Sequence, residues 1–160
     1  MLRNGFFSTA ILLTLGVGTV QAAKPPAASP LVAANLRGHW TCIRTGGTAA
    51  RFNEDWTPLF SGTWLRATDS EKGQATAEHT VTYNKADSTW ISVDLSPLGT
   101  NDVLHGTGSG TSQIAFHAVY PPKLALAVTY ARLTPTRYSI DVAGNVMGKK
   151  IKTHSVCDKR

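Results

Sequence analysis

The sequence is poor in charged residues, has only two cysteines, and has no long hydrophobic run beyond its first part. Charged residues make up 16% of the 160 residues, below the usual quarter, while the hydrophobic share of 42% is ordinary. This composition excludes a coiled coil, which would be rich in Glu, Lys, Leu and Ala. It also argues against disorder, because there are enough apolar residues to build a core. The length has room for one domain.

One long uncharged stretch is present, at residues 6–20, and it follows Arg3. Val20 and Ala22 provide acceptable side chains at the −3 and −1 positions of a signal-peptidase site, so a secretory signal peptide cleaved near Ala22 is predicted. A membrane anchor is the alternative, but it would need about 20 apolar residues. We therefore expect a periplasmic or secreted protein without a transmembrane segment after cleavage. Its parts would be a signal peptide at residues 1–22, a Pro/Ala-rich linker at 23–30 and a single domain at 31–160.

The two cysteines, Cys42 and Cys157, lie near the two ends of the expected domain. In an exported protein they predict one structural disulfide that joins the first and last elements of the fold. His39 and His154 each lie three residues before a cysteine, so a Cys2His2 metal site is the alternative. Residues three apart on a strand point to opposite faces, which favours the disulfide. Neighbouring first and last strands are typical of a closed barrel.

Short runs of alternating apolar and polar residues, broken by Gly, Pro, Asn and Asp, predict an all-β protein. No convincing helical pattern interrupts them, and residues 48–60 are expected to be irregular. The pattern and the disulfide favour an antiparallel β-barrel of about eight to ten strands, closed by one disulfide, over a sandwich. Strands are expected at residues 38–45, 61–69, 76–84, 88–95, 101–108, 112–119, 124–132, 136–142 and 147–157.

The start of the expected domain resembles the opening of lipocalin-like (calycin-like) β-barrels, which begin with Gly-x-Trp; here the motif is Gly38-His39-Trp40. The resemblance implies a lipocalin-like barrel whose closed end is plugged by Trp40. The later rhythm of the sequence resembles a group of small secreted bacterial domains of unknown function with this barrel shape. The residues that carry it are Gly38-His39-Trp40-Thr41-Cys42, Gly62-Thr63-Trp64-Leu65, Tyr83-Asn84 with Trp90, and Cys157.

Aromatic side chains are the candidates for a binding site, because ligand cavities are mostly apolar with a few polar groups. The candidate ligand-binding residues are Trp64, Tyr83, Trp90 and Phe116. Ordinary core packing is the alternative role for such side chains. Structural roles are assigned to Trp40, Cys42 and Cys157. The predicted function is a secreted or periplasmic binding barrel for a small, partly apolar ligand. The alternative is a non-catalytic envelope or protein-interaction module with a filled barrel core.

The histidines are weighed as metal ligands and as catalytic groups. His105 and His117 are expected to lie opposite each other across a hairpin centred on Thr111, with both side chains facing solvent. A metal site would need a third ligand, for which His79 is the candidate. Neither a metal nor a cofactor is predicted. An enzyme using one of these histidines ranks below the two binding hypotheses, and a strongly perturbed histidine in a cleft would raise it.

Neighbouring acidic residues do not indicate acid–base chemistry. Glu54 with Asp55, and Asp69 with Glu71, are expected in or beside loops, where carboxylates are usually solvated. Glu78 is adjacent to His79 on an expected strand, so the two side chains should point to opposite faces and cannot act as a simple dyad.

The end of the sequence is basic, with Lys149, Lys150 and Lys152 on or beside the last expected strand. Lys150 and Lys152 share one face and Ile151 takes the other. These lysines are the candidate contact for an anionic envelope component, such as lipid head groups or polysaccharide. A solvated outer face that guards a strand edge is the alternative. A nucleic-acid partner is not expected, because no aromatic-basic stripe is present.

Overall fold

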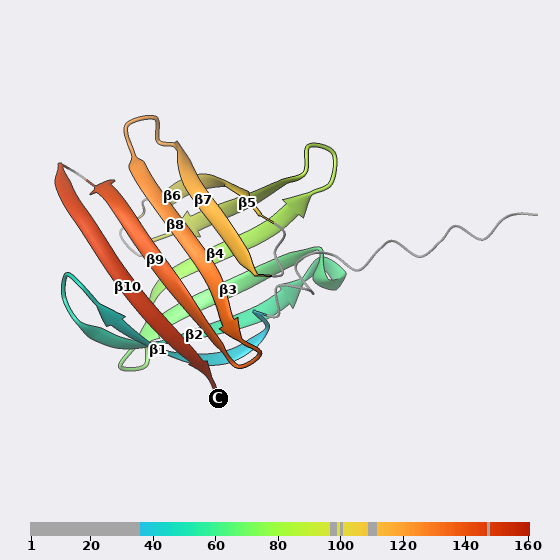
Figure 1. Cartoon of the computed structure of the whole chain (residues 1–160). Helices are drawn as coiled ribbons and strands as arrows, with labels where there is room; N and C mark the ends of the chain where they lie inside the picture. Colours follow the sequence, from blue (N-terminus) through green and yellow to red (C-terminus); the bar gives the residue numbers. More distant parts are fainter. Residues whose placement is uncertain (1–35, 97–98, 100, 109–111, 147) are drawn as a thin grey trace, which may run out of the picture.

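The computed structural model describes residues 36–96, 99, 101–108, 112–146 and 148–160. Ten antiparallel strands in these residues form one closed barrel, and β1 (Gly38–Thr45) pairs with β10 (Lys149–Lys159) to complete the ring (Figure 1). The predicted all-β antiparallel barrel is therefore confirmed. The predicted signal peptide at residues 1–22 and the linker at 23–30 lie outside the described residues.

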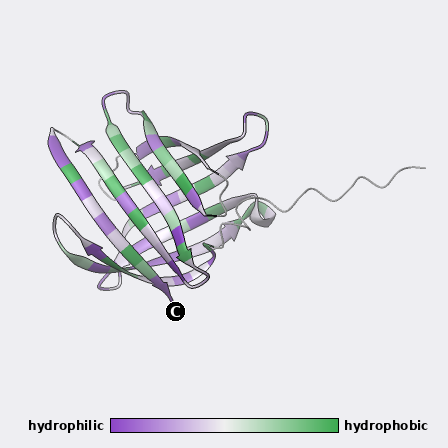
Figure 2. Cartoon of the chain, viewed as in Figure 1, coloured by the Kyte–Doolittle hydropathy of each residue, from purple (hydrophilic) through white to green (hydrophobic). Residues whose placement is uncertain are grey.

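Each strand pairs with its neighbours in sequence, so the barrel is a simple up-and-down ring. Hydropathy alternates along the strands, because one face of each packs into the barrel and the other faces solvent (Figure 2). A 3-10 turn, η1 (Phe60–Gly62), follows the second strand. The remaining strands are β2 (Ala50–Leu59), β3 (Trp64–Glu71), β4 (Gln74–Asn84), β5 (Thr89–Leu95), β6 (Asn101–Thr107), β7 (Gln113–Tyr120), β8 (Ala125–Thr134) and β9 (Arg137–Val146).

A disulfide joins the strands that close the ring. Cys42 and Cys157 lie directly opposite each other in the β1–β10 pair and form this bond across a sequence separation of 115. Both cysteines are fully buried. The predicted pairing is confirmed, whereas His39 and His154 bind exposed partners on the outer surface, Asp55 and Asp141.

Residues 48–60 were expected to be irregular, and this expectation is wrong because β2 covers most of them. Phe52, Glu54 and Trp56 alternate into the barrel and are all buried. The carboxyl group in the middle of this series interrupts the apolar alternation that reveals strands in a sequence. Pro58 fits because it lies one residue before the end of the strand, where a missing N–H disturbs the ladder least.

Trp40 fills one end of the barrel, which we call the Trp40 end. Its side chain is 2% exposed and packs edge-on against Tyr138 with the ring centroids 4.6 Å apart. The indole N–H donates a hydrogen bond to the Leu36 carbonyl over 2.6 Å. Aromatic burial with a satisfied N–H is the arrangement expected of a structural Trp, as the lipocalin-like resemblance implied.

The opposite end, which we call the mouth, carries the β1–β2 and β7–β8 connections. A hollow of about 780 Å³ lies at the mouth. Its walls include Asp102 on β6, Tyr120 on β7 and Leu124 in the β7–β8 connection. No helix in the described part of the chain is long and apolar enough to cross a membrane.

Candidate functional site

Five ionisable side chains from five adjacent strands lie on the face of each strand that lines the barrel. We call this set the acidic arc; its members are Glu54 on β2, Asp69 on β3, His79 on β4, Asp94 on β5 and Asp102 on β6. Each shares its face with buried neighbours two residues away, because side chains on a strand alternate between faces. The arc therefore places four carboxyl groups and one imidazole on the inner wall.

Strand register brings the arc together. Glu54 lies directly opposite Asp69 in the β2–β3 pair, and His79 lies directly opposite Asp94 in the β4–β5 pair. Asp94 is also directly opposite Asp102 in the β5–β6 pair. Directly opposed side chains on one face of an antiparallel pair are within contact distance of each other. The arc is thus a continuous series of neighbours around half of the barrel.

The imidazole of His79 lies between two carboxylates. Its Nε2 is 3.3 Å from Oδ2 of Asp69, and its Nδ1 is 3.1 Å from Oδ1 of Asp94. Asp94 also accepts a hydrogen bond of 2.6 Å from the buried Ser92 hydroxyl. These three side chains of the arc remain slightly exposed, at 17% for His79, 18% for Asp69 and 21% for Asp94.

The two carboxylates keep His79 in its charged form. Burial alone would lower the pKa of His79, but hydrogen bonding and charge attraction from Asp69 and Asp94 raise it well above 6.5. His79 is therefore an imidazolium at neutral pH and cannot act as a general base there. This strongly perturbed histidine is the feature that would raise the enzyme hypothesis. In the geometry observed, however, it binds carboxylates and no nucleophile.

Glu54 is the most buried member of the arc, with 1% of its surface exposed. Neither of its carboxyl oxygens has a hydrogen-bond partner among the described residues. Burial, together with the charge of Asp69, raises the pKa of Glu54 to about 8, against opposing contributions from Trp56 and His79. At neutral pH the Glu54 side chain is mostly a neutral carboxylic acid.

At the mouth end of the arc, Asp102 lines the hollow described above. Burial and the charge of Asp94 raise the pKa of Asp102 as well. The arc thus leads from a water-accessible carboxyl group at the mouth to a fully buried one at Glu54.

An aromatic wall accompanies the arc inside the barrel. Tyr130 on β8 contacts Trp56 and Phe116 edge-on, with ring centroids 6.0 and 6.2 Å apart. Burial, and then the charges of Glu54, Asp94 and Asp69, raise the pKa of Tyr130 well above 10. Tyr130 therefore stays neutral and offers a hydroxyl and a ring face beside the carboxyl groups.

Three of the four predicted ligand-binding residues lie on the inner wall. Trp90 is 0% exposed and donates its indole N–H to the Gly108 carbonyl over 3.0 Å, and Phe116 is also buried. Tyr83 packs edge-on against Trp90 at 5.2 Å. Trp64 lies on the opposite face of β3 from the buried Leu65, so it is not brought together with the other three.

The histidines divide between the two faces of the barrel. His105 and His117 are directly opposite each other in the β6–β7 pair and both are exposed, as predicted. His79 points into the barrel towards Asp69 and Asp94. It cannot complete a metal site with the outward-facing His105 and His117, so the prediction that it is their third ligand is wrong. The predicted separation of Glu78 from His79 is confirmed, because Glu78 forms an ion pair with Arg66 on the outer face.

Glu54 and Asp69 were expected to be solvated, in or beside loops, and this expectation is wrong. Both lie within strands and share a face with buried apolar residues. The sequence signal that could have revealed Glu54 is its position midway between Phe52 and Trp56, which places it on the same strand face as both. No comparable signal marks Asp69, whose neighbours two residues away are Ala67 and Glu71.

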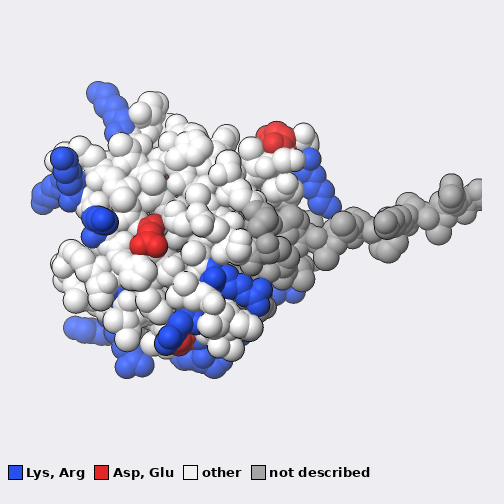
Figure 3. All heavy atoms as spheres, viewed as in Figure 1, with Lys and Arg blue, Asp and Glu red and all other residues white. Residues whose placement is uncertain are grey.

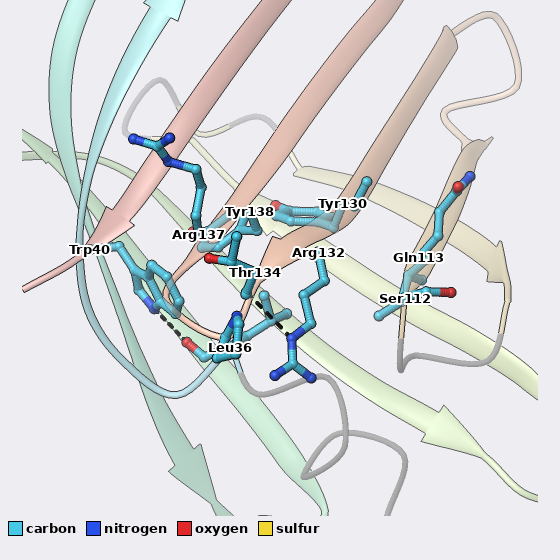
Figure 4. A pocket seen from close by; sticks show the side chains of 12 residues that line it. Leu36, Trp40, Ser112, Gln113, Tyr130, Arg132, Thr134, Arg137 and Tyr138 are labelled. Atoms are coloured by element: carbon cyan, nitrogen blue, oxygen red, sulfur yellow. Dashed lines mark hydrogen bonds between the residues drawn. The ribbon is translucent and has the colours of Figure 1, made fainter.

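The Trp40 end has a small cavity of about 20 Å³, enough for about one water molecule. Trp40, Tyr130 and Tyr138 form its inner side, and Arg132 and Arg137 lie at its rim (Figure 4). The buried hydroxyl of Tyr138 has no hydrogen-bond partner among the described residues. This cavity is too small for an organic ligand, so the mouth is the better entrance to the barrel.

Basic side chains border the mouth on its outer side. Lys150 and Lys152 are exposed on β10 and line a surface hollow of about 550 Å³ with Arg44 and Thr48. Arg44 is on the inner face of β1, over the buried Phe52 ring, and donates a hydrogen bond of 3.0 Å to Glu71, so its charge is paired. Lys and Arg side chains outnumber acidic ones on the visible face of the molecule (Figure 3). The predicted contact with an anionic envelope component remains a prediction.

The fold is a closed antiparallel barrel of ten strands. Among solved structures, this chain is similar to the S-type phycobiliprotein lyase from Guillardia theta, with a TM-score of 0.50 and 12% identity over 79% of this chain and 88% of that one. A redesigned β-barrel matches with a TM-score of 0.41 and 13% identity, over 81% and 96% of the two chains.

At this level of identity the likeness to the lyase shows the fold alone. No protein-family model matches the sequence, and no curated protein matches it either. The lipocalin-like resemblance in the sequence therefore agrees with the comparison at the level of the barrel. The finer resemblance to small secreted bacterial domains finds no support in these comparisons.

Proposed function

We propose that the protein is a binding barrel for a small, partly apolar ligand that enters at the mouth. The observation that carries the proposal is the inner wall, which combines aromatic rings with ionisable groups whose oxygens lack partners. A barrel core that serves packing alone gains nothing from such groups, since each buried polar atom without a partner costs about 1–3 kcal/mol. A ligand with complementary groups would remove that cost.

The size of the mouth supports this proposal. Ligand sites in proteins usually have volumes of about 300–1,000 Å³ and combine apolar walls with a few polar groups. The hollow at the mouth, at about 780 Å³, is within that range and has both Asp102 and Tyr120 on its wall.

We also propose that the protein works in a periplasmic or secreted location. The buried disulfide between Cys42 and Cys157 supports an oxidising compartment, because such bonds seldom persist in the cytosol. Cleavage near Ala22 would leave a chain that begins at Ala23. The mass of the exported protein tests this directly.

The second candidate is an interaction module with a filled core. It is favoured by the close contacts among interior rings, such as Tyr83 with Trp90 and Phe116 with Tyr130. In that case the exposed lysines on β10 would be the functional surface, and an anionic envelope component the partner.

Native mass spectrometry of the protein recovered from its export compartment, followed by a denatured spectrum, separates these two functions. The denatured mass should match residues 23–160, less about 2 Da for the disulfide. Extra native mass that disappears on denaturation supports the binding barrel, and a bare native mass favours the interaction module. A retained signal peptide would contradict the proposed location.

Tryptophan fluorescence adds a test for the position of the site. Ligand-dependent quenching should decrease when Trp90 is replaced by phenylalanine, since Trp90 lies on the inner wall. Trp64→Phe is the matched control, because Trp64 lies on the other face of its strand and should leave the quenching unchanged. The opposite pattern would place the ligand outside the barrel.

A further inference from the structure

We propose that the acidic arc binds the protonated amino group of an organic amine, so that the ligand of this barrel has a cationic head and an apolar body. This inference rests on the proposed function, because it assigns a ligand class to the same interior. It adds a recognition element that aromatic content alone does not provide.

The first support is the charge balance of the inner wall. No Lys or Arg among the described residues forms an ion pair with a member of the arc; His79 is the one cationic partner that its carboxylates have. The single positive charge of His79 neutralises only one of the two negative charges beside it, on Asp69 and Asp94. At least one negative charge of the arc is left uncompensated. Buried charges are ordinarily paired, so the arc lacks one cation.

The second support is a set of three acceptor oxygens without partners, beside which one donor, the Trp56 indole N–H, is also unpartnered and faces Glu54. They are Oε1 and Oε2 of Glu54 and Oδ1 of Asp69, all of them buried. Glu54 and Asp69 are directly opposed, so these atoms lie on one part of the inner wall. A primary ammonium group has three N–H donors and no acceptor, which matches three acceptors in number and in kind.

The surrounding rings suit a cation with an organic body. Trp56 and Tyr130 pack edge-on beside Glu54, and aromatic faces attract cations. The same rings offer apolar surface to a hydrocarbon chain. An inorganic anion would meet four carboxyl groups here, and the one cation of the arc, His79, already contacts two of them.

A divalent metal ion fits the arc less well than an amine does. Among the described residues, one group brings three candidate ligand atoms within 4.8 Å of one another, and it consists of Cys42, Glu54 and Cys157. Both sulfurs of that group are in the disulfide. Asp69 and Asp94 contact different nitrogens of His79, so they do not converge on one point.

Amine binding should release a proton from Glu54. The groups that face Glu54 are Asp69, His79 and Tyr130, with Asp55 next to it in sequence. In the free protein the neutral acid form of Glu54 is favoured. An ammonium group beside it would favour the carboxylate form instead. Alkylamines keep their own proton well beyond neutral pH, as lysine does. The proton released at pH 7 should therefore come from the protein.

Three probes with one tail and different heads test the inference: octylamine, octanol and octanoate. Isothermal titration calorimetry at pH 7 should show octylamine binding at least tenfold more tightly than either of the others. Repeating the octylamine titration in buffers of different ionisation enthalpy should reveal the release of about one proton per amine bound.

Two variants locate the effect. Glu54→Gln should weaken octylamine binding at least tenfold and abolish the proton release. Glu78→Gln is the matched control, since Glu78 is on the outer face and its partner is Arg66; it should change neither quantity by more than twofold. If Glu54→Gln does not fold, as judged by circular dichroism, the proton release of the unmodified protein decides the question.

The outcomes separate this inference from the function on which it rests. Equal binding of octylamine and octanol, or tighter binding of octanoate, would overturn the amine assignment and leave a binding barrel in place. Octylamine binding without proton release, or binding unchanged by Glu54→Gln, would place the amine away from the arc and overturn the assignment too. Binding of none of the three probes, with a bare native mass, would overturn both.

Discussion

We expect this protein to lose stability as pH rises through the pKa of Glu54, and replacing Glu54 with glutamine should remove that loss. Glutamine keeps the size and shape of the side chain but cannot ionise. In the unmodified protein, the pKa of Glu54 is about 8 in the folded state against 4.5 for an ordinary glutamate. A raised pKa means that the folded protein holds this proton over a pH range in which the unfolded chain has lost it.

The sign and size of the effect follow from proton linkage. Where the folded state binds more protons, the free energy of unfolding falls as pH rises, by about 1.4 kcal/mol per pH unit for one proton. Ionisation of Glu54 should therefore lower the free energy of unfolding of the unmodified protein by about 4 kcal/mol between pH 5 and pH 9. His79 acts in the same direction, because its raised pKa gives stability that is lost as pH rises through the folded value.

Urea unfolding followed by tryptophan fluorescence, with the disulfide intact, measures this at pH 5, 7 and 9. The free energy of unfolding of the Glu54→Gln variant, minus that of the unmodified protein, should increase by about 4 kcal/mol from pH 5 to pH 9. Glu78→Gln, on the outer surface, should show no comparable trend. A difference that stays constant with pH would mean that Glu54 is not a buried neutral acid, and the electrostatic account of the arc would be wrong.

Three further predictions concern the barrel itself. Trp40→Ala should lower the free energy of unfolding by about 3–5 kcal/mol in urea, because it removes a fully packed ring; a loss below about 1 kcal/mol would contradict its role as a plug. Replacing both Cys42 and Cys157 with alanine should lower the free energy of unfolding, measured by urea unfolding, by about 4–5 kcal/mol in the chain-entropy model. Gly106→Ala should cost about 1–3 kcal/mol, since its Cβ would lie 2.6 Å from the Phe116 ring; a thermal melt as stable as that of the unmodified protein would show that the ring can move.

The barrel could be predicted from the sequence because two independent features agreed. Period-two alternation located strands close to the observed β1 and β4–β10, and the two cysteines indicated that the first and last strands meet. Period-two alternation works when buried positions are apolar. It failed for β2, where a carboxyl group occupies the central buried position at Glu54.

The face on which an aromatic residue lies depends on its neighbours more than on its own type. Trp64 shares a face with Arg66, while Leu65 and Ala67 take the other face and are buried. A barrel that buried Trp64 would also have to bury Arg66, whose desolvation costs far more than the ring gains. The charge two residues away therefore decides the orientation, and this argument was available in the sequence.

The acidic arc was beyond sequence reasoning for a different reason, because register alone assembles it. Its members are separated along the chain by 15, 10, 15 and 8 residues, which reflects the lengths of successive hairpins and follows no motif. A register slip of one residue would move a whole strand face from inside to outside. The exposed pair His105 and His117 occupies directly opposed positions of this kind, but on the outer face. Both sets consist of ionisable side chains brought opposite each other by strand register, and the face of the strand decides which of them can meet a ligand inside the barrel.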